Sequence, residues 1–191
     1  MVIFTNYCLF LKFTVVVFFV FDYNRQENIF EAIQRYHCIR MEDKMEIVCL
    51  DLEGVLVPEI WIAFAEETGI PELKKTTRDE PDYDKLMKYR LNILKEHNLG
   101  LKEIQETIAK IDPLPGAKEF LDELRSLTQV IIISDTFTQF AKPLMKKLGW
   151  PTLFCNSLEV AEDGTITGFK MRIENSKLTT VKALQSAGFD T

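Results

Sequence analysis

Histidine is scarce in this chain, and its cysteines are not closely spaced. The 191 residues include only two histidines, His37 and His97, which lie far apart in sequence. This scarcity argues against a hydrolase built on a Ser–His or Cys–His pair. None of the four cysteines forms a CxxC pair, which argues against a zinc site or a redox motif. A nucleophile in this chain is more readily a carboxylate.

The chain also lacks an excess of basic residues. Its formal net charge is −6, which argues against a nucleic-acid partner. If an acidic protein of this kind binds an anionic ligand, it needs a cation to offset the charge, which favours a bound metal ion. The cysteine pattern indicates a reducing compartment, and we expect a cytoplasmic protein. The length suggests one domain, or one domain with a small insert.

The first 44 residues differ in character from the rest. Residues 1–21 are almost continuously apolar and long enough to span a bilayer. Lys12 lies in the middle of this run, at a cost of a few kcal/mol in a membrane, and no small-residue cleavage site follows. We therefore expect residues 1–44 to be an extension, with a mis-set start codon as its origin, and the domain to begin at Met45. The alternative is a membrane anchor formed by residues 1–21.

From Met45 onward, short apolar runs alternate with helical patterns. Residues 45–50 and 129–134 have the apolar, β-branched character of buried parallel strands. This alternation predicts an α/β fold with a mostly parallel, Rossmann-like sheet. A short third strand and a hairpin that turns at Asp163-Gly164 are expected later in the chain. The further helices are expected at residues 59–68, 117–127, 137–148 and 177–187.

Residues 72–110 form a separate block between the first helix and the second strand. They are rich in lysine, glutamate, leucine and isoleucine, with apolar residues at helical spacing. This pattern predicts two or three amphipathic helices. We expect the block to be a helical cap inserted into a domain of residues 45–191.

The strongest motif is the run Asp51-Leu52-Glu53-Gly54, directly after the first strand. In open α/β sheets, ligands bind at the carboxyl ends of the strands. Two carboxylates two residues apart can share one pocket there, so that one attacks phosphorus and the other transfers protons. Gly54 permits a tight turn after them. The alternative is a surface turn that follows a strand.

This motif resembles the signature of the haloacid dehalogenase-like superfamily, and residues 50–70 are similar to its phosphoserine phosphatases. The resemblance implies that Asp51 forms an aspartyl phosphate and that Glu53 is the general acid and base. It also implies that Asp51 and the backbone carbonyl of Glu53 bind Mg²⁺. Most phosphatases of the group have aspartate in place of Glu53. Glutamate is typical of a bacterial variant that also transfers phosphate to homoserine.

Further residues match the family at other motifs. Ser134 and Asp135 end the second strand and match a phosphate-binding motif, although serine there is also a common helix cap. Lys177 matches a lysine that neutralises phosphate; without the family it would be a surface residue. Glu59 and Arg90 match the positions that, in phosphoserine phosphatases, bind the amino group and the carboxylate of the substrate. The alternative for Arg90 is an exposed helical residue.

The family's fourth motif, usually Gly-Asp-x-x-x-Asp, has no counterpart in this sequence. Its aspartate completes the Mg²⁺ site, and Asp51 with one carbonyl is too little for a near-octahedral shell. The strand that carries this motif flanks the first strand in the family, so its absence predicts an exposed apolar edge at residues 45–51. We therefore expect a chain that lacks the last strands of the family's sheet.

The expected function is Mg²⁺-dependent hydrolysis of a small phosphate ester, O-phospho-L-serine, with transfer to homoserine as a further activity. The expected location is cytoplasmic. One alternative is a catalytically inactive remnant that binds only phosphate or a partner. A receiver domain phosphorylated on an aspartate is a third reading, and the cap-like insert and Glu59 argue against it.

Overall fold

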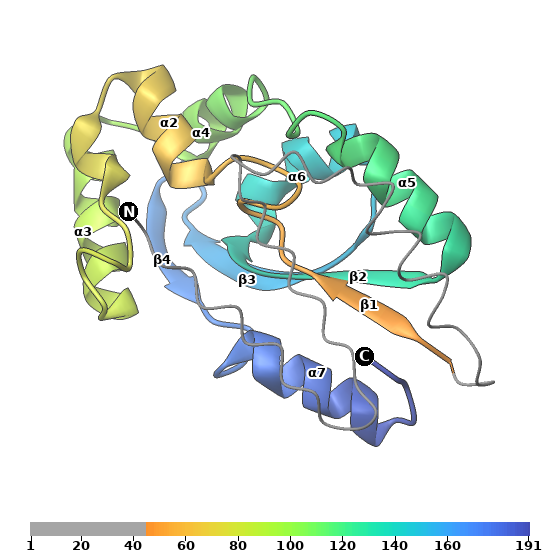
Figure 1. Cartoon of the computed structure of the whole chain (residues 1–191). Coiled ribbons are helices and arrows are strands. Elements are labelled where there is room, and N and C mark those ends of the chain that lie inside the picture. Colours follow the sequence, from red (N-terminus) through yellow and green to blue (C-terminus); the bar gives the residue numbers. More distant parts are fainter. Residues whose placement is uncertain (1–44) are drawn as a thin grey trace.

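Parallel strands alternate with helices through the described part of this computed structural model, residues 45–191 (Figure 1). The sheet has the order β1-β2-β3-β4. β1 pairs with β2 and β2 with β3 in parallel, whereas β3 and β4 form an antiparallel hairpin. This confirms the predicted α/β class with a mostly parallel sheet. The strands are β1 (Ile47–Leu50), β2 (Gln129–Phe137), β3 (Thr152–Val160) and β4 (Ile166–Lys170).

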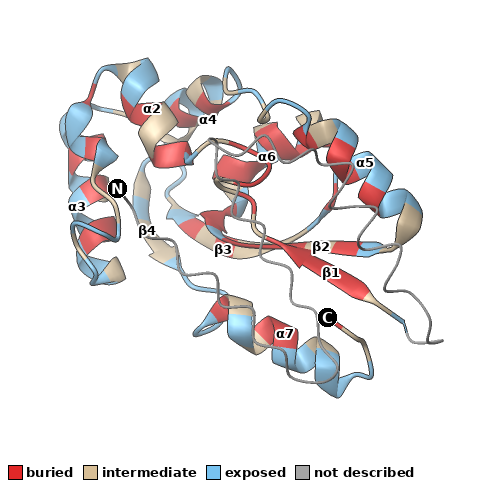
Figure 2. Cartoon of the chain, in the orientation of Figure 1, coloured by how far each residue is buried: buried red, intermediate tan, exposed pale blue. Residues whose placement is uncertain are grey.

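Helices cover both faces of the sheet because successive side chains of a strand point to opposite faces. Val48, Leu50 and Ile132 belong to the main apolar cluster, which includes α5 (Ala117–Leu127) and α6 (Thr138–Lys147). Ile47, Cys49 and Ile133 point the other way and pack with α7 (Ser176–Ser186). In Figure 2 β1 and most of β2 are red, so these strands are buried between the two helical layers.

Aromatic packing fixes helix α2 (Ile60–Thr68), which follows the Asp51 motif. The ring of Trp61 on α2 meets Phe140 on α6 edge to face, with centroids 5.4 Å apart. Phe140 meets Phe137 in the same way at 5.7 Å. Gly69 ends α2 in the left-handed conformation, with φ of 70°. The start of α2 is thus held against the carboxyl end of β2.

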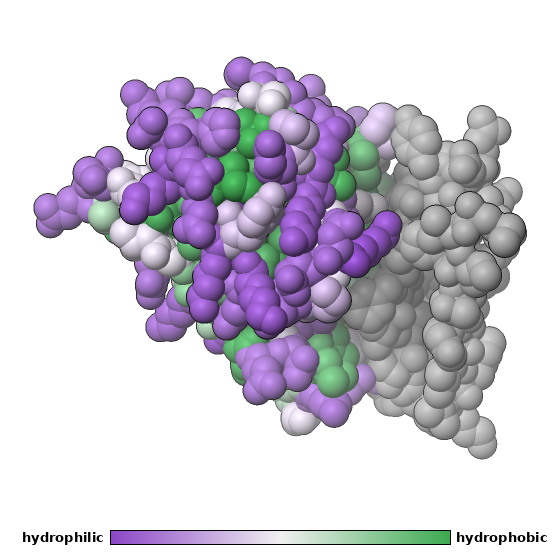
Figure 3. All heavy atoms as spheres, turned by 90° about the vertical axis from the view of Figure 1, so that its left-hand side faces the viewer, coloured by the Kyte–Doolittle hydropathy of each residue, from purple (hydrophilic) through white to green (hydrophobic). Residues whose placement is uncertain are grey.

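The block expected to be a cap forms a 3-10 turn and two helices: η1 (Pro71–Lys74), α3 (Tyr83–Glu96) and α4 (Leu101–Ile108). The Asp82 side chain caps α3 by accepting a hydrogen bond from the Lys85 amide at 3.1 Å. In Figure 1 α3 lies beside β4. Figure 3, which views this side of the molecule, shows a largely hydrophilic surface. The predicted number of helices is confirmed.

β2 is longer than the sequence pattern predicts. The expected strand ended at Ser134, but β2 continues to Phe137. Its pairing with β3 is regular up to Ile133, then shifts, and resumes where Phe137 meets Asn156. Such irregularities re-aim side chains next to functional sites. Here the irregular stretch contains Ser134 and Asp135.

β1 is an edge strand of this sheet, as expected, but its residues are buried. At its start the chain pairs with a segment near residue 190. The Ile47 amide donates to the Asp190 carbonyl at 2.7 Å, and the Asp190 amide donates to the Met45 carbonyl at 3.0 Å. The predicted edge position is thus correct, whereas the expected exposure is wrong for Ile47–Leu50, which are buried.

Residues 1–44 lie outside the described part of the structure, and so do the extension and the membrane anchor considered for them. Within residues 45–191, no helix is both long enough and apolar enough to cross a bilayer.

Candidate active site

Asp51 stands where β1 ends and a tight turn begins. Its Oδ1 accepts a hydrogen bond from the amide of Leu52 at 2.8 Å. The turn closes when the Gly54 amide donates to the Val57 carbonyl at 2.8 Å. Gly54 has φ of 73°, a region that favours glycine. The turn leaves Oδ2 of Asp51 free to face other elements.

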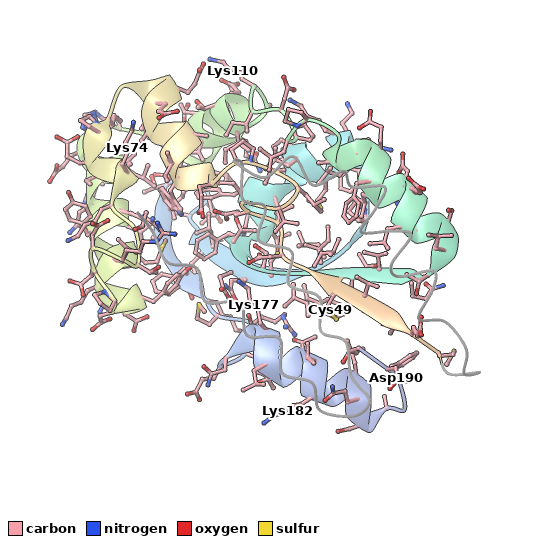
Figure 4. The ribbon with its side chains drawn as sticks, viewed as in Figure 1. Cys49, Lys74, Lys110, Lys177, Lys182 and Asp190 are labelled. Carbon is pink, nitrogen blue, oxygen red and sulfur yellow. The ribbon has the colours of Figure 1, made fainter. Side chains whose placement is uncertain are left out.

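Lys177 forms an ion pair with Asp51, although the two residues are far apart in sequence. It lies in the first turn of α7, and its Nζ contacts Asp51 Oδ2 at 2.6 Å and Asp135 Oδ2 at 3.3 Å (Figure 4). Partial burial opposes the lysine charge, but the hydrogen bond and charge of Asp51, with those of Asp135, raise the pKa of Lys177 above its ordinary value. A permanent cation thus stands beside the carboxylate that the motif predicts as nucleophile.

Glu53 is the second carboxylate of the motif, and it is held from two sides. Its Oε2 accepts a hydrogen bond from the Ile60 amide at 3.2 Å, at the start of α2. Thr136 also hydrogen-bonds to it. Burial, with the charges of Glu59 and Asp51, raises the pKa of Glu53 to about 7. Both protonation states are therefore accessible near neutral pH, as a group that acts as acid and then base requires.

The end of β2 forms the wall opposite β1. Leu50 pairs with Ile132, so this parallel register brings the residues that follow, Asp51 and Ser134, to the same edge of the sheet. Ser134 is buried, and its Oγ accepts a hydrogen bond from the Thr136 amide at 3.2 Å. The Asp135 carboxylate accepts from Ser176 Oγ at 3.0 Å through its other oxygen.

Arg90 is buried although it lies on a helix rich in charged residues; its exposed fraction is 6%. Its guanidinium stacks over the Trp61 ring, 4.5 Å from the centroid, and Nη2 donates to the Lys75 carbonyl at 2.8 Å. Burial lowers the pKa of Arg90 to about 10, while Tyr83, Glu53 and Glu59 act to raise it. The alternative of an exposed helical residue is excluded.

The hydrogen bonding of the Arg90 guanidinium is incomplete within residues 45–191. Its Nε is buried without a hydrogen-bond partner among the described residues. An unpaired buried donor on a charged group is costly, so it calls for an acceptor from outside this set. A carboxylate suits a guanidinium best, because two oxygens match its fork of donors.

A family comparison agrees with this geometry. The model of the haloacid dehalogenase-like hydrolase family matches residues 45–188. The chain belongs to this family.

Two bacterial relatives in the family are similar in sequence. Phosphoserine phosphatase ThrH of Pseudomonas aeruginosa is 59% identical over 142 residues, which cover 74% of this chain and 69% of that protein. A phosphoserine phosphatase of Pseudomonas syringae pv. tomato is 55% identical over 145 residues, covering 76% of this chain and 61% of that protein. The chain thus spans somewhat less than two thirds of the second relative's length.

Solved structures of the family share the fold. A substrate-bound phosphoserine phosphatase complex has a TM-score of 0.62 at 24% identity and covers 78% of this chain and 75% of that one. A phospho-aspartyl intermediate analogue of phosphoserine phosphatase gives the same TM-score, identity and coverage. At this identity the likeness concerns the fold.

The residues predicted from sequence fall into two groups. Ion pairs join Lys177 to Asp51 and to Asp135, whereas Glu53, Glu59 and Arg90 act on one another through their charges. Ser134 lies at the same sheet edge. Sequence reasoning missed three residues that hydrogen-bond to Asp135, which are Tyr83, Asn156 and Ser176. Their only signal was polarity next to a motif or to an expected strand end.

Phosphoserine phosphatases of the haloacid dehalogenase-like family are metal-dependent, and the donors present here fit part of a metal shell. The Asp51 carboxylate and the Glu53 carbonyl are oxygen ligands of the kind that Mg²⁺ prefers. Within residues 45–191, however, no group of three or more His, Cys, Asp or Glu side chains could hold a metal ion. These residues therefore do not form a complete magnesium site.

Proposed function

We propose that this protein hydrolyses O-phospho-L-serine through an aspartyl phosphate on Asp51. One observation carries the proposal: the ammonium of Lys177 contacts Asp51 Oδ2 at 2.6 Å. Glu53, a half-buried carboxyl group, follows two residues after Asp51. A nucleophile, a fixed cation and an acid/base group are the parts that transfer of a phosphoryl group needs. The names of the two Pseudomonas relatives support phosphoserine as the substrate.

The reaction has two steps. In the first, an Asp51 oxygen bonds to phosphorus, the bond from phosphorus to the serine oxygen breaks, and Glu53 gives that oxygen a proton. In the second, Glu53 takes a proton from water, the water oxygen bonds to phosphorus, and the bond to Asp51 breaks. An alcohol such as homoserine in place of water would receive the phosphate instead.

Lys177 and the end of β2 would hold the phosphoryl group during both steps. The Lys177 cation offsets the negative charge that the phosphate brings next to Asp51. The Ser134 hydroxyl and a backbone amide would donate to the phosphate oxygens. The Asp135 side chain carries a negative charge that repels phosphate, so its part in phosphate binding would run through its contacts with Ser176 and Lys177.

The amino-acid part of the substrate would lie between α2 and α3. Glu59 would meet the substrate ammonium, and Arg90 would meet the carboxylate. The unpaired Nε of Arg90 supports this assignment, because a substrate carboxylate would supply its missing acceptor. The helical insert of about residues 72–110 would then act as a cap that closes over the substrate.

Magnesium completes the proposal. The Asp51 carboxylate and the Glu53 carbonyl would hold it. The remaining oxygen ligands would be groups other than the carboxylate side chains of residues 45–191. Bound there, the ion would supply a positive charge that offsets the phosphate. We further propose a cytoplasmic enzyme of serine biosynthesis. The free thiols of Cys49 and Cys155 agree with a reducing compartment.

Chelation tests the role of the metal. Treating the full chain with EDTA should remove phosphatase activity, and adding Mg²⁺ back should restore it, because Asp51 and the Glu53 carbonyl are oxygen ligands suited to this ion. Phosphate release is measured before and after each addition, with Ca²⁺ as a comparison ion. Activity that survives complete chelation would show that the reaction needs no metal.

Replacing Arg90 by alanine tests recognition of the substrate carboxylate. Arg90→Ala should raise KM for O-phospho-L-serine by about tenfold or more, since a charged hydrogen bond contributes about 1.5–3 kcal/mol. The KM for phosphoethanolamine, which has no carboxylate, should change far less. Lys88→Ala, an exposed residue on the same helix, serves as the control. Equal losses on the two esters would show that Arg90 is only structural.

A panel of phosphate esters tests the proposed substrate. With Mg²⁺, the full chain should release phosphate from O-phospho-L-serine with a higher kcat/KM than from phosphothreonine, phosphoethanolamine or p-nitrophenyl phosphate. A better rate with an ester that lacks the amino-acid group would reject phosphoserine as the substrate. Binding of phosphoserine without turnover would instead favour a protein that only binds the ligand.

A further inference from the structure

Asp135 is a junction where three parts of the molecule meet. Its backbone carbonyl accepts hydrogen bonds from Tyr83 Oη on α3, at 3.2 Å, and from Asn156 Nδ2 on β3, at 2.9 Å. A carbonyl has two lone pairs, so it can accept both. Its carboxylate faces Ser176 and Lys177 at the start of α7. Helix α3 of the insert, strand β3 and helix α7 therefore all contact Asp135.

Asn156 makes the sheet side of this junction rigid. It is 1% exposed, and its Oδ1 accepts a hydrogen bond from the Arg172 amide at 2.9 Å. Its amide group thus spans from the end of β2 to the segment before α7, with both ends bonded. A buried side chain that is bonded at both ends helps hold its neighbours in one geometry. The Asp135 carbonyl is consequently a fixed point.

Tyr83 is the contact between α3 and this fixed point. Its ring packs edge to face on Phe169 of β4, with centroids 5.9 Å apart, and Phe169 packs on Phe137 at 6.2 Å. Burial, then the charge of Asp135, raises the pKa of Tyr83, so its hydroxyl remains a donor. Ring packing alone would allow α3 to shift along β4, whereas the hydrogen bond from the Tyr83 hydroxyl fixes its position.

Arg90 lies seven residues after Tyr83, two turns along the same helix. Residues at this spacing share a helix face. Holding Tyr83 in place therefore also sets where α3 presents Arg90 over Glu53 and Glu59. Arg90 is also held directly by the Lys75 carbonyl and the Trp61 ring, and the bond from Tyr83 to the Asp135 carbonyl ties the same helix face to β2.

We infer that Tyr83 is a positioning residue whose hydroxyl, bonded to the Asp135 carbonyl, sets the place of the inserted helices over the phosphate-binding end of β2. Its effect is on the binding of the amino-acid part of the substrate, through Arg90, and not on the chemistry at Asp51. This inference rests on the proposed function for its substrate and on the contacts above for its geometry.

The test is Tyr83→Phe in the full chain, which removes the hydroxyl and keeps the ring on Phe169. Tyr89→Phe is the matched control, because Tyr89 lies on the same helix, is 37% exposed and has its ring under the Lys75 ammonium. Tyr83→Phe should raise KM for O-phospho-L-serine about three- to tenfold, the effect of one neutral hydrogen bond. Its kcat and KM for p-nitrophenyl phosphate should stay within about twofold of wild type.

The same two variants are compared by amide hydrogen exchange across residues 83–96. Tyr83→Phe should speed exchange in this helix, and Tyr89→Phe should not, because only the first releases α3 from β2. An unchanged KM for phosphoserine in Tyr83→Phe, or equal losses on both esters, would overturn the inference. If the wild-type chain does not use phosphoserine, the proposed function fails. The exchange comparison then decides alone: faster exchange in Tyr83→Phe supports the inference, and equal exchange in both variants overturns it.

Discussion

Replacing Asp51 by asparagine should lower phosphate release by about a thousandfold or more, because an amide of the same shape cannot attack phosphorus as a carboxylate does. The fold should remain, since the Asp51–Lys177 pair is partly exposed and Lys177 keeps Asp135 as a partner. The midpoint of thermal unfolding should therefore move by no more than about 4 °C. Phosphate release and calorimetry measure the two effects.

The control for this variant is Asp112→Asn. Asp112 also forms an ion pair with a lysine, Lys147, at 2.8 Å, but its side chain is 85% exposed. Removing its charge should leave the rate unchanged. If Asp51→Asn keeps more than about a tenth of the wild-type rate, Asp51 is not the nucleophile.

Replacing Glu53 by glutamine should slow turnover by about a hundredfold or more, the usual contribution of a general acid or base. The second step should suffer most, because glutamine cannot take the proton from the attacking water. The aspartyl phosphate should therefore accumulate. Rapid acid quenching followed by intact-protein mass spectrometry measures the phosphorylated fraction, and phosphate release gives the overall rate.

Glu66→Gln is the matched control for this experiment. Glu66 lies on α2 and forms an exposed ion pair with Lys74 at 2.9 Å, so its charge can be removed without changing the carboxyl group of Glu53. This variant should turn over like the wild type and hold no excess phosphate. An unchanged rate in Glu53→Gln, with no phosphorylated protein, would contradict the assignment.

The strands and their order along the chain could be predicted because apolar patterns are local. Four consecutive apolar residues, Ile47–Leu50, predict a strand buried on both faces, and the structure has that strand. The end of β2 could not be predicted in the same way. Ser134, Asp135 and Thr136 are polar, and they stay in the strand because β3 lies alongside and resumes pairing at Asn156.

In the candidate site, too, residues in a local motif could be predicted and contacts between distant residues could not. Asp51 and Glu53 were found together because one turn of the chain carries both. Lys177 is 126 residues from Asp51 in sequence, and only the family resemblance predicted that Lys177 belongs to the same site. The burial of Arg90 was left open by the sequence, because a helix pattern does not say which element covers a charged position. Trp61 settles it in the structure.

The junction at Asp135 is the clearest case of what sequence reasoning could not reach. The hydrogen bonds from Tyr83 and Asn156 join positions 52 and 21 residues away in sequence. Neither residue has a pattern that marks it, because the bond depends on where the inserted helices rest on the sheet. Tertiary packing creates such sites.

The most direct test of the account is to trap the phosphorylated enzyme and locate the phosphate. The full chain is mixed with radiolabelled O-phospho-L-serine and Mg²⁺, quenched in acid within the first turnover, and digested for mass spectrometry. The account predicts label on the peptide that contains Asp51, and none in the Asp51→Asn variant. Release of phosphate with no labelled protein at any time, or label on another residue, would contradict it.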